Sequence, residues 1–281
     1  MRGKDNFYAV CSTFCDANLD LSIRMTRAPG HATQIALDEA AGYDRIVCCG
    51  GDGTFNETLA GILESGLNTP IGYIPAGSTN DFASSLKLSS DILEATQDII
   101  LGTPVAYDAG KFGQRYFSYV ASFGAFTRTS YATPQSIKNA LGHTAYVLEG
   151  IQELSQIRKE HIKMIIDGEE VEDDFLFGAI CNSTSVGGIL TLDPEVVDLQ
   201  DNKLEILLVR APKNLAEIHE CIVALNTQKY NCAMLTFRSA THIRIFADPD
   251  MPWTLDGERE EGHSEVVVTP QHLAYRLMKR Q

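Results

Sequence analysis

The run GGDGTFNE at residues 50–57 combines residue types that suit the binding of an anion. Its three glycines let backbone amides approach a ligand closely, and a helix that begins within the run adds a partial positive charge. Thr54 supplies a hydroxyl or caps the helix. Asp52 would be a carboxylate beside phosphates, which favours Mg²⁺ between them. The alternative is a glycine-rich strand-to-helix turn in which Asp52 is only the N-cap.

A second glycine run, PAGSTNDFA, occupies residues 75–83. Like the first run, it follows a short apolar segment and precedes a helical one. We therefore expect both runs to face the crevice at the carboxyl ends of a parallel sheet. Taken alone, the second run is typical of a capped turn with Asn80 or Asp81 as the cap. Neither run is a P-loop, and the Rossmann GxGxxG pattern is absent.

The segments around these runs alternate between strand and helix patterns up to residue 103. Short apolar runs predict strands at 45–49 and 70–75, and apolar residues at helical spacing predict helices from Pro29, over 55–63 and over 91–101. Such alternation predicts an α/β domain with a parallel sheet and flanking helices over residues 1–103.

Beyond residue 103 the pattern changes to longer strands joined by hairpin turns. Strands are predicted at 105–111, 115–126, 161–166, 175–181, 204–209, 242–247 and 265–269, and helices at 134–157 and 215–227. This predicts an antiparallel β-sandwich-like second domain over residues 104–265, with residues 266–281 returning to the first domain.

Composition excludes several functional classes. The formal charge of −14 argues against a nucleic-acid partner, which would need a basic face. Seven cysteines without a CxxC pair favour a reducing, cytoplasmic setting over a disulfide framework. The first residues are charged and no apolar region follows, so we expect no signal peptide. The longest apolar run, at 175–181, is far too short to span a bilayer.

Together, GGDGTFNE and PAGSTNDFA resemble the motifs of the diacylglycerol kinase catalytic domain family, which includes bacterial diacylglycerol kinases, related lipid kinases and sphingosine kinases. The resemblance covers nearly the whole chain. It implies an N-terminal α/β domain that binds nucleotide in its crevice and an antiparallel β domain after it. The NDFA half of the second run is more similar to diacylglycerol kinases, and the PAGS half to sphingosine kinases.

The resemblance also implies which residues bind ATP. In the family pattern, a threonine precedes a Gly-Asp-Ala motif, and Thr26 matches it, although His31 replaces the usual Asp. The residues expected to contact ATP are Thr26, Gly50, Gly51, Asp52, Gly53, Thr54, Phe55, Asn56, Ser78, Asn80 and Asp81.

Two Asp-Gly-Glu triplets occur, at residues 167–169 and 256–258. The first lies between two strand patterns and predicts a hairpin turn with an exposed Glu169. In the family, the general base is the glutamate of the later triplet, so the resemblance assigns this role to Glu258. A lipid hydroxyl that attacks a γ-phosphate must lose its proton, which a carboxylate can accept. From the residues alone, a second hairpin turn is equally acceptable.

The segment at residues 198–204 is similar to the family's structural Mg²⁺ loop. The resemblance places the Asp201 carboxylate around the ion, with Asp198 and Lys203 beside it. Asn202 stands where the family usually has glycine, and asparagine tolerates a positive φ. The alternative is a solvated acidic loop.

We therefore predict an ATP- and Mg²⁺-dependent lipid kinase that converts diacylglycerol to phosphatidic acid, with Glu258 as base and Asp52 organising Mg²⁺-ATP. Its substrate would be reached by transient, peripheral contact with a membrane, near the basic residues Arg276, Lys279 and Arg280. The alternatives are another kinase with a GGDGT loop, such as a sphingosine-type kinase, NAD kinase or phosphofructokinase, and a binding protein that has lost catalysis.

Family members normally begin with a strand and an Asn-Pro-x-Ser-Gly loop, whereas this sequence enters a helix pattern at Phe7. We expect the first strand and its loop to be lacking. An unpaired sheet edge would weaken ATP binding and favour association, for instance as a homodimer.

Overall fold

The structure is a computed structural model that describes residues 6–78, 80–124, 158–186, 190–192, 197–227, 230 and 232–280. The chain divides into two compact units, Met1–Ala109 with Gln271–Gln281, and Gly110–Pro270. The predicted domains change at residues 103 and 266. The units instead change within two strands, β3 (Thr103–Phe112) and β15 (Glu265–Lys279).

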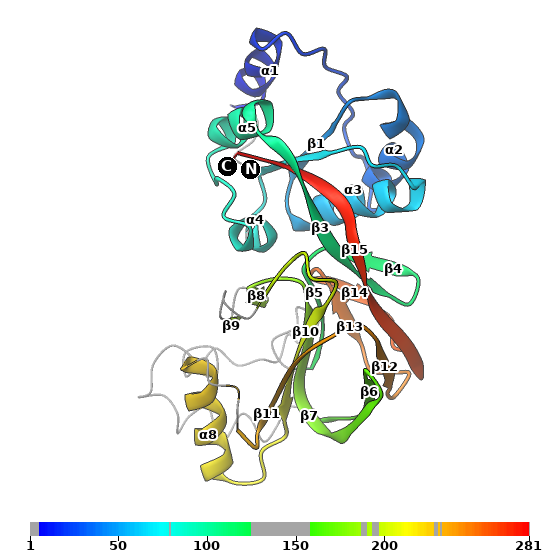
Figure 1. Cartoon of the computed structure of the whole chain (residues 1–281), viewed down its shortest axis with the longest axis vertical. Helices are drawn as coiled ribbons and strands as arrows, with labels where there is room; N and C mark the ends of the chain where they lie inside the picture. The colour runs from blue at the N-terminus through cyan, green and yellow to red at the C-terminus, as the bar shows by residue number, and fades with distance from the viewer. Residues whose placement is uncertain are drawn as a thin grey trace. The chain divides into compact units, whose positions relative to one another are not determined.

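The first unit contains a parallel sheet flanked by helices, as predicted. Strand β1 pairs in parallel with β2, from Ile46 opposite Ile71 to Gly50 opposite Pro75, and β15 pairs in parallel with β2. Its elements are α1 (Phe7–Asp16), α2 (His31–Glu39), η1 (Ala40–Gly42), β1 (Ile46–Gly50), α3 (Asp52–Ser65), β2 (Ile71–Pro75), α4 (Asp81–Ser85) and α5 (Ile92–Leu101). Figure 1 shows α1 beside α5, and α2 beside α3.

Successive side chains of β2 point to opposite faces of the sheet, and all of them are buried, so both faces of the strand are covered. Ile74 packs against α1 and α5 in one apolar cluster. Its neighbour Tyr73 faces the other way, with its ring 4.7 Å from that of Phe55 in α3. A strand covered by helices on both faces reads as a continuous apolar run, which is why its position could be predicted.

Helix α2 begins at His31, two residues after the predicted start at Pro29. Gly30 is its N-cap and has a φ of 79°, a left-handed conformation that glycine adopts without strain. The helix predicted over residues 134–157 lies outside the described residues.

The second unit is built of antiparallel pairs, as predicted. Sheet neighbours follow the order β12-β6-β7-β5-β13-β14, with β10 also on β7 and β11 on β10. The elements are β4 (Arg115–Phe117), β5 (Val120–Gly124), β6 (Glu160–Ile166), β7 (Glu169–Cys181), β8 (Ser185–Val186), β9 (Leu190–Thr191), β10 (Leu204–Arg210), α8 (Leu215–Asn226), β11 (Leu235–Ala240), β12 (Ile243–Phe246), β13 (Trp253–Leu255) and β14 (Glu258–Glu260). Phe112, Phe123, Phe175 and Trp253 are among the large side chains of its core.

Two strand predictions are wrong in extent. The single strand predicted at 115–126 is interrupted at Ser118 and Tyr119, whose N–H groups turn to the Asp256 carboxylate instead of a neighbouring strand. The strand predicted at 265–269 continues to Lys279. Pro270 obscures this continuation in the sequence. In the structure the strand passes through a positive φ at Leu273, whose N–H donates to the buried Asp108.

Candidate functional site

The two glycine runs lie against each other at the carboxyl ends of β1 and β2. These strands end together, and the N–H of Ala76 donates to the carbonyl of Gly50 at 2.8 Å. A Cβ on Gly77 would lie 2.6 Å from the Gly51 Cα, and one on Gly51 would lie 3.2 Å from the Gly77 Cα. Glycine is therefore required here because two backbones meet, which confirms the expectation that both runs share one edge.

Asp52 links the two runs. It is the first residue of α3 and is only 8% exposed. Its Oδ2 accepts the N–H of Asp81 at 3.1 Å, and its Oδ1 accepts the N–H of Phe82 at 3.3 Å. These N–H groups belong to the first turn of α4, where no intrahelical acceptor is available. Gly51, rather than Asp52, is the N-cap of α3, so the carboxylate caps a different helix.

A buried aromatic cluster packs beneath the two glycine runs, with one ring from each of α3, β2 and α4. The Phe55 ring stacks on that of Phe82 with centroids 4.4 Å apart, and Tyr73 packs beside them. Phe55 is fully buried, and its N–H donates to the Gly51 carbonyl. Its predicted role as an ATP contact therefore does not hold for its side chain, which anchors α3 instead. Burial and the charge of Asp52 raise the pKa of the neighbouring Tyr73 hydroxyl.

The remaining residues of the first run lie in the first turns of α3. Gly53 and Thr54 are half-buried, and the Thr54 side chain lies where a Cβ on Gly50 would collide with it at 2.8 Å. Asn56 is 4% exposed, and its Oδ1 has no hydrogen-bond partner. The N–H groups of a first helical turn can bind phosphate oxygens, so this turn suits an anion.

Ser78 and Asn80 shape the second run. Asn80 is the N-cap of α4 with a φ of 54°, and its amide bonds to both backbone groups of Gly77, accepting at 3.0 Å and donating at 3.1 Å. Asn80 thereby holds Gly77 against Gly51. Ser78 is exposed and Asp81 is 8% exposed.

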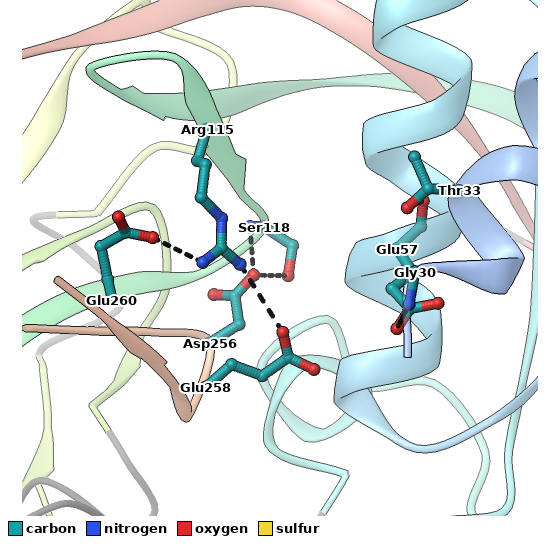
Figure 2. Close-up of polar contacts among 8 residues, drawn as sticks. All are labelled: Gly30, Thr33, Glu57, Arg115, Ser118, Asp256, Glu258 and Glu260. Carbon is teal, nitrogen blue, oxygen red and sulfur yellow. Dashed lines mark hydrogen bonds and ion pairs between the residues drawn. The ribbon is translucent and has the colours of Figure 1, made fainter. Parts of the chain in front are cut away.

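Glu57, the last residue of the first run, has a role that the sequence did not reveal. Its carboxylate accepts the N–H of Gly30 at 2.7 Å, and Thr33 Oγ1 donates to its carbonyl (Figure 2). The carboxylate also accepts the N–H of Ala32 at 3.0 Å. Glu57 thus caps α2 from α3. Nearby, His31 accepts the Arg27 N–H through Nδ1, and Thr26 lies exposed in the preceding irregular segment.

In the second unit, both Asp-Gly-Glu triplets form hairpin turns. Asp256 and Gly257 have φ values of 50° and 82°, and Asp167 and Gly168 have values of 47° and 91°. Asp256 and Gly257 join β13 to β14, and Asp167 and Gly168 join β6 to β7. Both triplets have the backbone expected of an Asp-Gly hairpin. Their surroundings decide how they differ.

Asp256 is buried and holds its hairpin firmly. Its carboxylate accepts the N–H of Ser118 at 2.6 Å and the hydroxyl of Ser118 at 2.8 Å (Figure 2). It also accepts the N–H groups of Tyr119 at 3.0 Å and Val120 at 2.9 Å. Burial raises the pKa of Asp256 to about 6, although these hydrogen bonds act in the opposite direction. Asp167 is exposed and accepts hydrogen bonds from Thr241 and His242.

Glu258 follows this fixed turn, and its side chain is 44% exposed. It lies 3.6 Å from the guanidinium of Arg115, which also contacts Glu260 (Figure 2). Glu169, the equivalent residue of the other hairpin, is 72% exposed and pairs with Arg238. Both glutamates are paired with an arginine. Only Glu258 follows a turn that is fixed by a buried aspartate with several hydrogen bonds.

The candidate metal residues lie in one exposed turn before β10. Asp198 Oδ1 accepts the Gln200 N–H, and Asp201 Oδ1 accepts the Lys203 N–H, each at 3.0 Å. The Lys203 ammonium is 3.7 Å from Asp201 Oδ2. Asn202 has a φ of 63°, as expected for a residue that replaces glycine. Within the described ranges, no group of three or more His, Cys, Asp or Glu side chains is arranged to hold a metal.

Glu205 nevertheless makes this loop fit a cation. It is 1% exposed in β10, and neither of its carboxylate oxygens has a hydrogen-bond partner. Burial, together with the charges of Asp201 and Asp198, raises its pKa to about 8. A buried, unpaired carboxylate beside two others is costly unless a positive charge is present. The signal for Glu205 in the sequence is one acidic residue within an apolar strand pattern.

Comparisons with known proteins agree with this architecture. A family model described as "Diacylglycerol kinase catalytic domain" matches residues 1–112. Another, described as "YegS C-terminal NAD kinase beta sandwich-like domain", matches residues 120–276. The predicted fold class, an α/β domain followed by a β-sandwich-like domain, is confirmed.

Two relatives match this chain over most of its length. A diacylglycerol kinase of Bacillus subtilis (strain 168) is 31% identical over 258 residues, which are 91% of this chain and 84% of that protein. Another, of Staphylococcus carnosus (strain TM300), is 32% identical over 246 residues, 86% of this chain and 79% of that protein. The crystal structure of a diacylglycerol kinase from Bacillus anthracis str. Sterne is 20% identical with a TM-score of 0.75, and the match covers 99% of this chain and 93% of that one.

Proposed function

The chain belongs to the diacylglycerol kinase family, and from this premise we propose that it transfers the γ-phosphate of ATP to the hydroxyl of diacylglycerol, giving phosphatidic acid. The observation that carries the proposal is the contact between the two glycine runs, which Asp52 locks by capping α4. A site made of helix N-termini and close backbone turns suits a polyphosphate.

The first unit would bind ATP. The first turn of α3 and the backbone of residues 50–51 and 77–78 would donate to phosphate oxygens, with Ser78 and Thr54 adding hydroxyls. Each Asp52 oxygen accepts one backbone N–H, which leaves carboxylate lone pairs for a cation. A Mg²⁺ ion held there would neutralise phosphate charge during transfer.

Glu258 would act as the general base. Its carboxylate accepts the proton of the lipid hydroxyl while the hydroxyl oxygen forms a bond to the γ-phosphorus. The bond from that phosphorus to the β–γ bridging oxygen breaks, and ADP leaves with the electron pair. The protonated Glu258 then releases its proton to solvent, which restores the carboxylate.

The loop at residues 198–203 would hold a second Mg²⁺ with a structural role. Asp201 would provide the carboxylate, and Asp198 and Lys203 would flank it through their positions in the turn. Glu205 supports this assignment because its buried carboxylate has no hydrogen-bond partner, and a cation nearby would favour its ionised form.

Access to the lipid would occur by transient contact with a membrane surface. In the described part of the chain, no helix is long and apolar enough to cross a bilayer. The basic end of the sequence is partly engaged within the first unit, because Arg280 lies 3.9 Å from Asp98 and the Lys279 ammonium donates to the Leu86 carbonyl. Arg276 is exposed.

The decisive test offers the purified protein ATP and Mg²⁺ together with diacylglycerol, sphingosine or NAD in separate reactions, and measures ADP release and the phosphorylated product. We expect phosphatidic acid to form at the highest rate. Preferential phosphorylation of NAD or sphingosine would favour another kinase with the same loop, and ATP binding without any product would favour a nonenzymatic relative.

A further inference from the structure

Glu258 is held by a cation from another hairpin. Arg115 opens β4, just after the turn at Gly113 that ends β3. Its Nη2 lies 3.6 Å from Glu258 Oε2, and its Nη1 donates to Glu260 Oε2 at 2.5 Å (Figure 2). One guanidinium thus spans two carboxylates of β14.

The alternation of β14 explains this arrangement. Residues two apart in a strand point to the same side, so Glu258 and Glu260 can both reach Arg115, whereas Arg259 between them points away. The planar guanidinium presents several donors in a fixed fork, which lets it bind two carboxylates at once in one geometry.

The contacts of Arg115 with Glu258 and Glu260 differ in length and in solvent exposure. The Glu260 side chain is 13% exposed, while those of Arg115 and Glu258 are 43% and 44% exposed. The shorter, more buried contact fixes the guanidinium, and its other amino group then reaches the exposed Glu258. An ion pair as exposed as that with Glu258 adds little to stability, so its main effect is on orientation.

We propose that Arg115, anchored by Glu260, is a positioning residue that holds the Glu258 carboxylate in the orientation needed to accept the substrate proton. This inference rests on the proposed function. A glutamate at an exposed turn has several rotamers, and most of them would point the carboxylate away from a bound hydroxyl. An anchored guanidinium restricts these rotamers before substrate arrives.

The central experiment is Arg115→Gln, assayed for kcat, KM and, separately, the Kd of ATP. We expect kcat to fall about 10–100-fold, because a misplaced catalytic group costs rate rather than binding. The Kd of ATP should stay within twofold of its original value. Arg115→Lys keeps the charge but loses the fork, so its kcat should lie between those of the two proteins.

Two further variants test the anchor. Glu260→Gln should lower kcat in the same direction but less, and the double variant Arg115→Gln/Glu260→Gln should be no slower than Arg115→Gln alone. Residues that act through one network are not additive. The matched control is Arg259→Gln, which removes an equal charge beside Glu258 without touching the network and should keep the original kcat. Melting temperatures confirm that each variant is folded.

A spectroscopic arm does not depend on turnover. In a ¹⁵N spectrum of the guanidinium groups, Arg115 should show restricted rotation that Glu260→Gln releases. The inference is overturned by an unchanged kcat in Arg115→Gln, by an equal loss in Arg259→Gln, or by freely rotating Arg115 in the original protein. A rise in the ATP Kd that accounts for the whole loss would make Arg115 an ATP ligand instead. If Glu258→Gln retains turnover, it is the proposed role of Glu258 that fails.

Discussion

At the scale of single residues, two buried aspartates, Asp52 and Asp256, have structural roles that their motifs do not reveal. Asp52 caps α4 and Asp256 binds three consecutive amides and a hydroxyl, so each carboxylate fixes backbone from a different element. Such buried acceptors are costly to remove, because every donor left unpaired must be desolvated without compensation. Glu258, in contrast, has a side chain that is 44% exposed and contacts Arg115.

Replacing Glu258 by Gln should lower kcat by ~10²–10⁴-fold, because the amide keeps the shape but cannot accept a proton. ATP binding, measured by calorimetry, should be nearly unchanged. The matched control is Glu169→Gln, in the other Asp-Gly hairpin, for which we expect no loss of turnover. Equal losses in the two variants would mean that the base was assigned to the wrong hairpin.

Glu205 should give the metal-free protein a characteristic pH dependence. Its pKa is raised from 4.5 to about 8, so the folded state holds the proton more tightly than the unfolded chain. Its contribution to stability is therefore best below pH 4.5, falls as pH rises from 4.5 to about 8, and is level above. In EDTA at pH 7, Glu205→Gln should be more stable by ~1–3 kcal/mol.

Denaturant unfolding across this pH range measures the effect of Glu205. The control is Glu261→Gln, an exposed glutamate whose loss should leave the pH profile unchanged. A Glu205→Gln profile parallel to that of the original protein would show that this carboxylate does not titrate between the two states.

At the scale of elements, the contact between the glycine runs is the tightest constraint on the proposed ATP site. A Cβ on Gly77 would lie 2.6 Å from the Gly51 Cα and 2.7 Å from Asn80 Oδ1, so Gly77→Ala must push the runs apart. We expect a loss of ~1–3 kcal/mol in stability, as is typical for overpacking. ATP affinity should fall at least about tenfold, since phosphate-facing amides move.

Calorimetric titration with ATP and thermal unfolding test both effects of Gly77→Ala. Gly42→Ala is the matched control, because a Cβ there meets nothing within 4 Å. Normal ATP affinity in Gly77→Ala would show that the runs are not the phosphate site.

The acidic turn before β10 makes a second prediction at this scale. Mg²⁺ should raise the melting temperature of the intact protein, because a bound ion stabilises the folded state by mass action. Asp201→Ala should abolish that increment and lower activity as well. Asp250→Ala, which removes another exposed carboxylate, should retain the increment. An intact protein whose melting temperature ignores Mg²⁺ would refute a structural ion.

At the scale of the whole molecule, the charge of −14 should govern how the enzyme meets its lipid. With diacylglycerol in vesicles, an anionic lipid should reduce activity a few-fold at low salt, and added salt should restore it by screening the repulsion. Short-chain diacylglycerol in neutral detergent micelles is the control and should show no such salt effect. Higher activity on anionic vesicles at low salt would indicate a basic surface that the overall charge conceals.

Much of this molecule was determined by sequence alone, because the relevant signals are local. Glycine-rich turns after apolar runs, helical spacing and Asp-Gly turns all depend on residues close in the chain. They predicted β1, α3, β2, α5 and the hairpin at Asp167-Gly168, and they include the two glycine runs that resemble the diacylglycerol kinase motifs. A hairpin at residues 256–258 was one of two alternatives that the sequence left open. The break between β4 and β5 was missed, because its cause is Asp256, 138 residues from Ser118.

Only the tertiary structure decided what the individual side chains do. It buried the Phe55 side chain and turned the Asp52 carboxylate towards the N-terminus of α4. It brought the Glu57 carboxylate to the N-terminus of α2. It also placed Arg115 between Glu258 and Glu260, although Glu260 is 145 residues away in the chain. It also enclosed Glu205 without a hydrogen-bond partner. The physical reason is that burial and pairing depend on which distant segments meet, whereas propensity and periodicity depend only on neighbours along the chain.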